Sequence, residues 1–264
     1  MTGRYVFEVR RYDSPALPHV PVAFLITMPG STRRAQYLHQ LGEFRPCATV
    51  VVVHNPGHRR MRKSCAGRPV VAPALDLWHT NQLVARLCLR LRAPVLVLED
   101  DVEFTEAFRE LAAGISRDVI SGRADAYTLG TVPFVSCGAR QGLRVVVGAA
   151  AHAVIYTAAA RRRLLFRTVV ALHDVEILAG LRTLAPRRPC AVQRIGEPTA
   201  NSRHWDVGGL PSALLCVLSS GDPRTLERFE LFERAHRVGQ WGGLVVVLVA
   251  VVLCVLRASS ASKR

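Results

Sequence analysis

The sequence VPVAFLITMPGSTRRAQYLHQLGEFRPCATVVVVHNPG, residues 20–57, contains a strand, a helix and a second strand in succession. Its opening VPVAFLIT is a continuous apolar run that ends before a Pro-Gly pair, which is typical of a strand buried on both faces. Residues 31–41 predict a helix with Ser31 or Thr32 as its N-cap. The β-branched run at residues 49–53 stops at an Asn-Pro-Gly turn and predicts the second strand. This order is the beginning of a doubly wound α/β sheet.

The chain continues this alternation up to residue 222. We predict helices at residues 72–91, 105–115, 157–165 and 175–184, and strands at residues 94–98, 143–147 and 191–195. The pattern therefore indicates one α/β domain over residues 1–222, and a charged amphipathic helix follows it over residues 223–237.

The composition excludes several classes of protein. The chain has 264 residues, half of them hydrophobic, so it is neither a disordered tail nor a small disulfide scaffold. It carries 35 Lys and Arg against 20 Asp and Glu, a net charge of +15. Only 6% of the residues are aromatic, and no helix-turn-helix, zinc-finger or RNA-binding signature is visible. The charge therefore favours a polyanionic partner, and we expect no specific nucleic acid.

The C-terminal region predicts a membrane anchor. Residues 238–256, VGQWGGLVVVLVAVVLCVL, contain no charge and would form a helix about 28 Å long, enough to span a bilayer. A buried core helix is the alternative, but the stretch has no polar face. Only residues 257–264 follow, and the N-terminus lacks the apolar run of a signal peptide. We therefore expect a single-pass, tail-anchored protein with residues 1–237 on the cytosolic side. Those residues keep 32 basic against 20 acidic side chains, a net charge of +12.

The cysteines agree with a reducing compartment. There are seven, they are scattered, and no pair has the C-x-x-C spacing of a redox or zinc motif. We expect reduced thiols.

One candidate site is the sequence VLVLEDDVEF, residues 95–104. Glu99, Asp100 and Asp101 follow a buried strand, at the edge where open α/β sheets bind ligands. Asp100 and Asp101 are candidate ligands for Mg or Mn, a hard cation that would neutralise the diphosphate of a nucleotide sugar, and Glu99 would share that cofactor site. The alternative is that these acids only stabilise the start of the following helix through its dipole.

A second polar group lies in ALHDVEIL. His173, Asp174 and Glu176 stand in an apolar context, and Asp174 is a candidate catalytic base toward an acceptor hydroxyl. An ordinary helix capped by Asp174 is the alternative. His204 is a further candidate metal ligand, although a lone histidine beside Trp205 more often packs.

The third candidate is a set of basic clusters. Guanidinium groups donate forked hydrogen bonds to sulfate and phosphate, so clustered arginines favour polymers of such groups. An unoccupied, solvated surface is the alternative. The expected polyanion contacts are Arg59, Arg60, Arg62 and Lys63, and after them Arg161, Arg162 and Arg163, with further pairs at Arg33, Arg34, Arg187 and Arg188.

The order of these motifs resembles a known family. AFLITMPGSTRRAQYL, LDLWHTN, VLVLEDDVEF, GAAAHAVIYTAAARRRLL and HDVEIL follow one another as in the family 25 glycosyltransferases, over roughly residues 20–205. The arrangement with a C-terminal anchor is similar to that of the heparan-sulfate-binding envelope proteins of poxvirus mature virions. The resemblance implies a three-layer, Rossmann-like glycosyltransferase A fold, a UDP-sugar type of ligand, display on a virion membrane and attachment to cell-surface glycosaminoglycan.

Two functions follow as hypotheses. In the first, the chain is an envelope protein whose basic surface captures heparan sulfate for attachment to host cells. In the second, it is a metal-dependent glycosyltransferase in which Asp101 holds the cation, Glu99 and Asp100 shape the site and Asp174 is the base. A cytosol-facing domain favours the first, because most sugar transfer to secreted acceptors occurs in the lumen, whereas a virion can display a cytosolic face outward.

Overall fold

The computed structural model describes residues 4–65, 67–130, 132–140, 143–149, 152–167 and 177–193. The four described helices are α1 (Arg34–Phe44), α2 (Pro73–Leu87), α3 (Glu106–Ile120) and α4 (Ala158–Leu165). The described strands are β1 (Val6–Arg11), β2 (Val22–Thr27), β3 (Thr49–His54), β4 (Ser64–Cys65), β5 (Arg68–Pro69), β6 (Val95–Glu99), β7 (Val102–Phe104), β8 (Ala126–Thr128), β9 (Val132–Arg140), β10 (Leu143–Ala149), β11 (Ala153–Tyr156), β12 (Thr183–Pro186) and β13 (Ala191–Gln193).

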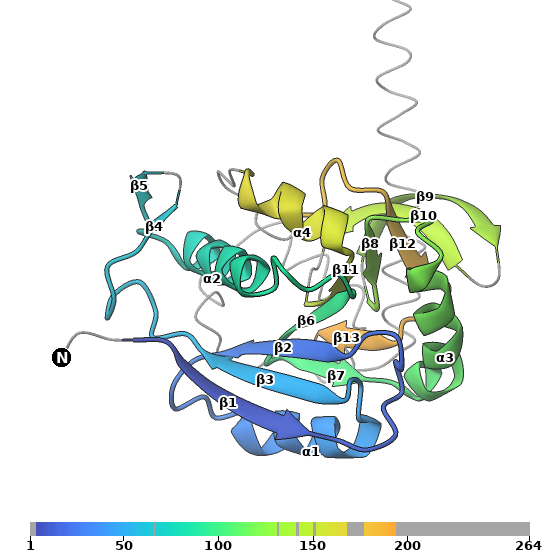
Figure 1. Ribbon diagram of the computed structural model, residues 1–264, viewed down its shortest axis with the longest axis horizontal. Helices are drawn as coiled ribbons and strands as arrows, with labels where there is room; N and C mark the ends of the chain where they lie inside the picture. Colours follow the sequence, from blue (N-terminus) through green and yellow to red (C-terminus); the bar gives the residue numbers. More distant parts are fainter. Residues whose placement is uncertain are drawn as a thin grey trace, which may run out of the picture.

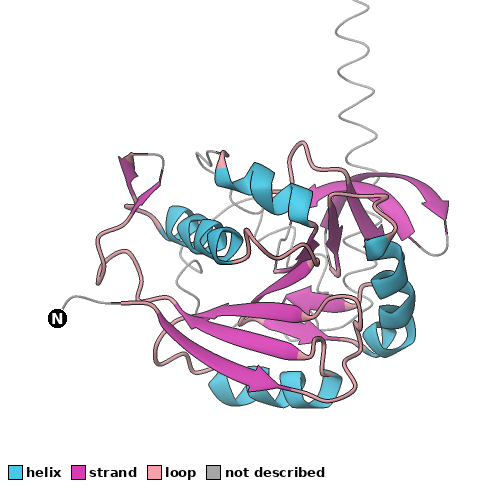
Figure 2. Cartoon of the chain, in the orientation of Figure 1, coloured by secondary structure: helices cyan, strands magenta, loops and turns pink. Residues whose placement is uncertain are grey.

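The described strands form a nine-stranded mixed sheet with strand order β1-β3-β2-β6-β11-β8-β12-β10-β9. Figure 1 labels these strands, and Figure 2 shows strands in magenta and helices in cyan. β2 pairs in parallel with both β3 and β6, whereas β1 is antiparallel to β3 and β11 is antiparallel to β6. Two short ribbons, β13-β7 and β4-β5, lie outside the sheet. The expected α/β class is confirmed, but the sheet is mixed rather than parallel throughout.

The helices cover both faces of the sheet, so the fold has three layers (Figure 1). Side chains of β2 alternate between two cores: Ala23 and Leu25 pack with residues of α1 and α3, and Phe24 and Ile26 pack with residues of α2 and α4. A strand buried on both faces needs apolar residues at every position, and this explains the uninterrupted apolar run at residues 20–27.

Most of the predicted elements are present. The structure confirms the strands β2, β3, β6, β10 and β13 and the helices α1 to α4, with ends that differ by a few residues. Of the prediction for residues 175–184, the described part is wrong: residues 177–180 form a turn, and Thr183–Pro186 form strand β12. Leu184 pairs in parallel with Tyr127 of β8. The strand is therefore fixed by a partner far away in the chain, and the local sequence shows no alternation that would indicate it.

The predicted N-cap of α1 is also wrong. The helix begins after Arg33, which makes no side-chain capping bond. Ser31 instead donates its hydroxyl to Asp100 and accepts the backbone N–H of Arg33. The tertiary contact with Asp100 therefore replaces the local cap that the sequence suggests.

The predicted thiol state holds where the structure can be inspected. Cys47, Cys65, Cys88 and Cys190 are buried and free. The predicted juxtamembrane helix and the anchor at residues 238–256 lie outside the described residues. Among the residues that are described, no helix is both long enough and apolar enough to cross a membrane.

Glu8 on β1 predicts a specific response to acid. Arg34 and Arg10 donate hydrogen bonds to its carboxylate and lower its pKa from 4.5 to about 2. Because the folded pKa is depressed, this stabilisation is complete above the unfolded value and is lost as the pH falls through about 2. The free energy of unfolding should therefore fall less steeply in Glu8→Gln than in the parent chain between about pH 5 and pH 2, measured by urea titration. Identical slopes in the two proteins would contradict this assignment.

Candidate functional site

The carboxyl ends of β2 and β6 form the switch point of the sheet. From β2 the chain passes through α1 to β3 on one side, and from β3 it passes through α2 to β6 on the other side of β2. The two crossover helices lie on opposite faces, so these strand ends are the edge at which doubly wound folds place ligands. Thr27 ends β2, Glu99 ends β6, and Asp100 and Asp101 follow directly. The predicted position of the acidic group at the end of a buried strand is confirmed.

The acidic pair is already engaged by side chains of the β2–α1 loop. Thr27 and Ser31 donate their hydroxyls to Oδ2 of Asp100 at 2.6 and 2.8 Å. The guanidinium of Arg33 lies 3.3 Å from Oδ1 of Asp100 and 3.9 Å from Oδ2 of Asp101. Arg33 and Asp101 are both buried. The loop therefore supplies one internal cation to the two carboxylates and two hydroxyl donors to Asp100.

This arrangement does not fit the expected Mg or Mn site. A cation would need carboxylate oxygens, but both oxygens of Asp100 are engaged and Arg33 holds a positive charge beside Asp101. Within the described residues, no group of three or more His, Cys, Asp or Glu side chains is placed to hold a metal ion. We therefore derive no metal-dependent step from these residues.

A second polar cluster lies inside the molecule at the end of β3. Lys63 forms an ion pair with Asp76 and donates a hydrogen bond to Oδ1 of Asn55. Asn55 donates to Oδ2 of Asp76 at 3.1 Å, and the backbone N–H of His58 donates to the same oxygen. The side chain of Lys63 is 0% exposed. Its predicted role as a polyanion contact is therefore wrong, because it has no surface from which to reach a polymer.

The cluster braces the loop that follows β3. Burial lowers the pKa of Lys63, although its pair with Asp76 acts in the opposite direction. The ammonium also lies 4.7 Å from the ring centroid of Tyr5, whose hydroxyl is hydrogen-bonded to Thr80. Burial raises the pKa of Tyr5 to about 12. A loop held at both ends by these buried contacts presents its remaining side chains in a defined position.

Arg161 is the third predicted basic residue that the structure places in the interior, after Arg33 and Lys63. It is 2% exposed, and its guanidinium donates hydrogen bonds to backbone carbonyls of four residues, Cys88, Leu91, Ala93 and Tyr156. It thereby joins the end of α2 and the segment before β6 to the start of α4. Its predicted contact with a polyanion is wrong for the same reason as that of Lys63.

Arg33 of the predicted basic residues is also buried, whereas the remaining ones lie on the surface. Arg59, Arg60, Arg62 and Arg162 are exposed, and Arg163 is exposed but forms an ion pair with Asp125 at 2.8 Å. Two arginines that the sequence analysis did not single out, Arg68 and Arg86, are exposed as well. We call the set without Arg163 the basic face, and its members are Arg59, Arg60, Arg62, Arg68, Arg86 and Arg162.

Gln82 of α2 joins the two parts of the chain that carry the basic face. Its Oε1 accepts from Sγ of Cys65 in the β4–β5 hairpin, at 3.1 Å. Its Nε2 donates to the carbonyls of Leu164 and Arg167 at the end of α4, at 3.3 and 3.2 Å. The hairpin and the end of α4 therefore meet over one side chain, on the side of the sheet that α2 and α4 cover (Figure 1).

The charge on this layer is one-sided. Residues 55–93 contain eight Lys and Arg and a single acid, Asp76, which is buried with Lys63; residues 157–167 contain four Arg and no acid. Within the described part of the chain, no residue of the basic face makes an ion pair. The α1 and α3 layer differs, because Arg109 pairs with Glu43 and Arg188 pairs with Glu110. The sequence could have predicted this difference in charge between the two layers, because Asp76 is the only acid in residues 55–93.

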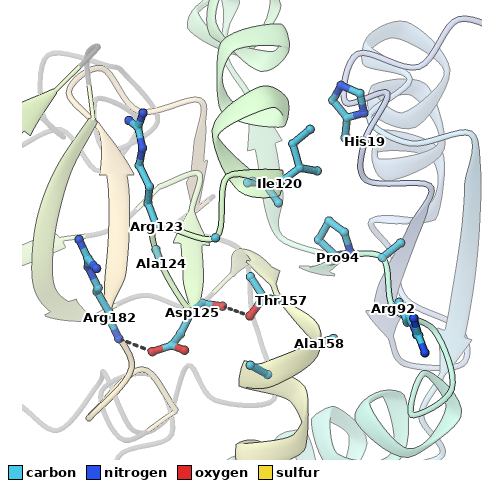
Figure 3. A pocket seen from close by; sticks show the side chains of 14 residues that line it. His19, Arg92, Pro94, Ile120, Arg123, Ala124, Asp125, Thr157, Ala158 and Arg182 are labelled. Atoms are coloured by element: carbon cyan, nitrogen blue, oxygen red, sulfur yellow. Dashed lines mark hydrogen bonds between the residues drawn. The ribbon is translucent and has the colours of Figure 1, made fainter.

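A cavity of about 780 Å³ lies at the opposite edge of the sheet from Asp100. Figure 3 shows His19 and Arg92 on one side of it and Arg123 and Arg182 on the other. Its one acidic lining residue, Asp125, accepts the backbone N–H of Arg182 at 3.0 Å. The cavity lies beside the amino end of β6, away from the switch point, and it adds basic side chains next to α4.

Several predicted site residues fall outside the described part of the chain. These are His173, Asp174, Glu176 and His204, so the predicted catalytic base has no position relative to Asp100 and Asp101. A scan of protein-family models and a search of curated proteins each found no match to the chain.

Proposed function

We propose that the chain is a tail-anchored envelope protein that binds heparan sulfate through the basic face and attaches virions to host cells. The observation that carries the proposal is the unpaired positive charge of the α2 and α4 layer, where six arginines are exposed and the one acid of residues 55–93 is buried with Lys63. Sulfated polymers bind such surfaces through forked guanidinium contacts and long-range attraction.

The dimensions of the face suit an extended polymer. α2 runs from Pro73 to Leu87, about 22 Å at 1.5 Å per residue. The loop that carries Arg59 and Arg60 is hydrogen-bonded to Asp76, which lies in the first turn of α2. Arg86 lies in the last turn of the same helix. The positive side chains are thus spread along a helix axis rather than gathered around a cavity, as a binding surface for a linear chain requires.

The membrane part of the proposal rests on sequence. The uncharged stretch at residues 238–256 supports a C-terminal anchor, and the resemblance to poxvirus envelope proteins supports the virion membrane. A cytosolic domain on the membrane from which a virion is built would become its outer surface.

Retention on heparin tests the proposal. In the full chain in detergent, Arg59→Ser, Arg60→Ser and Arg62→Ser together should weaken heparin binding about 100-fold near physiological salt. Each exposed ion pair contributes about 1 kcal/mol at most, and 1.4 kcal/mol is a factor of ten. The parent chain should lose affinity steeply as salt increases, and the triple variant should show a shallower dependence.

A matched control removes the same charge from the opposite layer. Arg109→Ser, Arg117→Ser and Arg188→Ser together change the net charge equally but lie on or beside α3. This variant should retain most of the parent affinity. Equal losses in the two triple variants would show that net charge alone attracts heparin, and would refute the basic face as the site.

A nucleotide-sugar transferase is the second candidate. The observation that favours it is the position of Asp100 and Asp101 at the switch point of the sheet. The pairing of both acids with Arg33 opposes it. Manganese-dependent hydrolysis of a uridine diphosphate sugar that is lost in Asp101→Asn would support this candidate, and its absence across a panel of nucleotide sugars would count against it.

A further inference from the structure

Among the described strands, none but β3 pairs with β1, and none lies along its outer edge. β1 stands at the end of the sheet order. Its apolar side chains are unusually exposed: Val6 is 49%, Phe7 44% and Val9 57% accessible. An edge strand with exposed apolar residues is a template for another strand, and proteins usually blunt such edges with proline, bulges or inward charges. β1 contains no proline, and its register with β3 is continuous over Val6–Arg11.

The backbone of β1 presents regularly spaced donors and acceptors along that edge. The N–H of Tyr12 donates to the carbonyl of Ala48 in the direction of β3. Backbone groups alternate in direction along an antiparallel strand. The N–H and C=O groups of Phe7, Val9 and Arg11 therefore point away from β3, toward the open edge.

The sequence of β1 is complementary to itself about Val9. We propose that two copies of this chain associate by antiparallel pairing of β1 with β1, around a two-fold axis at Val9. Glu8 then lies opposite the partner's Arg10, and Phe7 lies opposite the partner's Arg11, which suits a contact between a cation and a ring. Val9 forms a reciprocal hydrogen-bonded pair with the partner's Val9.

Neighbouring registers are less favourable. An axis at Glu8 would place Glu8 opposite the partner's Glu8, and an axis at Arg10 would place Arg10 opposite the partner's Arg10. Like charges directly opposite one another on paired strands are destabilising. Glu8 already accepts hydrogen bonds from Arg10 and Arg34 of its own chain, and only the axis at Val9 adds a partner's Arg10 to this cluster in both directions without opposing like charges. Charge complementarity therefore favours a second copy as the occupant and this register.

The pairing would enlarge the surface proposed for heparan sulfate. A two-fold axis that relates antiparallel strands of one continuous sheet is perpendicular to that sheet, so equivalent faces remain on the same side. The basic faces of the two copies would therefore point in the same direction. A dimer with two binding sites binds a long polymer more tightly than one site does, because the second site meets the polymer at a high effective concentration once the first is bound. This consequence rests on the proposed function, whereas the pairing itself does not.

Cross-linking at Val9 tests the pairing and its register. In the full chain in detergent, Val9→Cys treated with a short thiol-specific cross-linker should give a covalent dimer, because the two β-carbons would be about 4.5–5.5 Å apart. Arg11→Cys is the matched control. Its thiols would be four residues apart along paired strands, about 13 Å, beyond the reach of the reagent. The parent chain controls for its own cysteines, of which Cys47, Cys65, Cys88 and Cys190 are buried.

A second variant measures the pairing without cross-linking. Val9→Pro removes an N–H that points away from β3, so the strand can keep its pairing with β3, as edge strands tolerate. The variant should raise the dimer dissociation constant at least tenfold by light scattering or sedimentation. It should also reduce retention on long heparin chains more than binding to a short oligosaccharide.

The outcomes separate this inference from the proposed function. A chain that stays monomeric at about 100 µM, with no cross-linking in Val9→Cys, overturns the pairing even if it binds heparin. Cross-linking of Arg11→Cys as efficient as that of Val9→Cys overturns the register. A dimer that cross-links at Val9 and does not bind heparin supports the pairing and refutes the proposed function.

Discussion

Lys63→Ser is expected to lower the free energy of unfolding by about 3–5 kcal/mol, the usual cost of removing one partner from a buried ion pair. The substitution leaves Asp76 buried with only the side-chain amide of Asn55 and the N–H of His58 to hold its charge. Asp76→Asn should cost a similar amount, because it leaves the ammonium of Lys63 without its counter-charge. Urea unfolding followed by circular dichroism measures both.

The neighbouring arginine is the control for this prediction. Arg62 is exposed, and Arg62→Ser should change the free energy of unfolding by less than about 0.5 kcal/mol while weakening heparin binding. Lys63→Ser should show the reverse, with unchanged heparin binding by the folded fraction. A stable Lys63→Ser protein that loses heparin binding would show that Lys63 is a contact residue after all.

Arg161→Ser should also destabilise the fold by about 3–5 kcal/mol. The substitution removes a charged donor from the backbone carbonyls of Cys88, Leu91, Ala93 and Tyr156. Each buried acceptor left unsatisfied costs about 1–3 kcal/mol, and water that enters the site lowers this cost. Arg161→Lys should recover only part of the loss, since a single ammonium cannot reproduce the planar fork. Thermal and urea unfolding of the two variants give the comparison.

Arg162 provides the matched variant for Arg161. It is the next residue on α4 and is exposed, so Arg162→Ser should leave stability unchanged within about 0.5 kcal/mol and should reduce heparin affinity. If Arg161→Ser were as stable as Arg162→Ser, the interior position of Arg161 would be wrong. The pairs Lys63 with Arg62 and Arg161 with Arg162 thus separate structural from surface cations at adjacent positions.

Sequence patterns predicted the central elements because their periods are strong. β2, β3 and β6 are buried on both faces and read as apolar runs, and α2, α3 and α4 carry helical spacing. The sequence patterns did not predict β1, β9 or the short strands β4, β5, β7, β8 and β11. Three or four residues show no clear period, and β1 is half exposed with charges at alternate positions.

The position of the acidic group at the sheet edge could be predicted from the local sequence. Residues that follow a strand lie at the edge of the sheet whichever strands are its neighbours. The partners of the acidic group were not predictable. Thr27, Ser31 and Arg33 reach Asp100 from about 70 positions earlier in the chain, and only the parallel pairing of β2 with β6 brings them together. The contact of Arg33 with both acids follows from that pairing.

The amino-acid sequence by itself determined the α/β class, the excess of positive charge and the identity of the basic clusters, because these depend on composition and on repeats a few residues long. The tertiary structure alone decided which cations are structural. Lys63 and Arg62, or Arg161 and Arg162, are equivalent in sequence, yet one member of each pair points inward to an acid or to carbonyls and the other points to solvent. The direction of a side chain is fixed by the elements packed around it, and those elements come from distant parts of the chain.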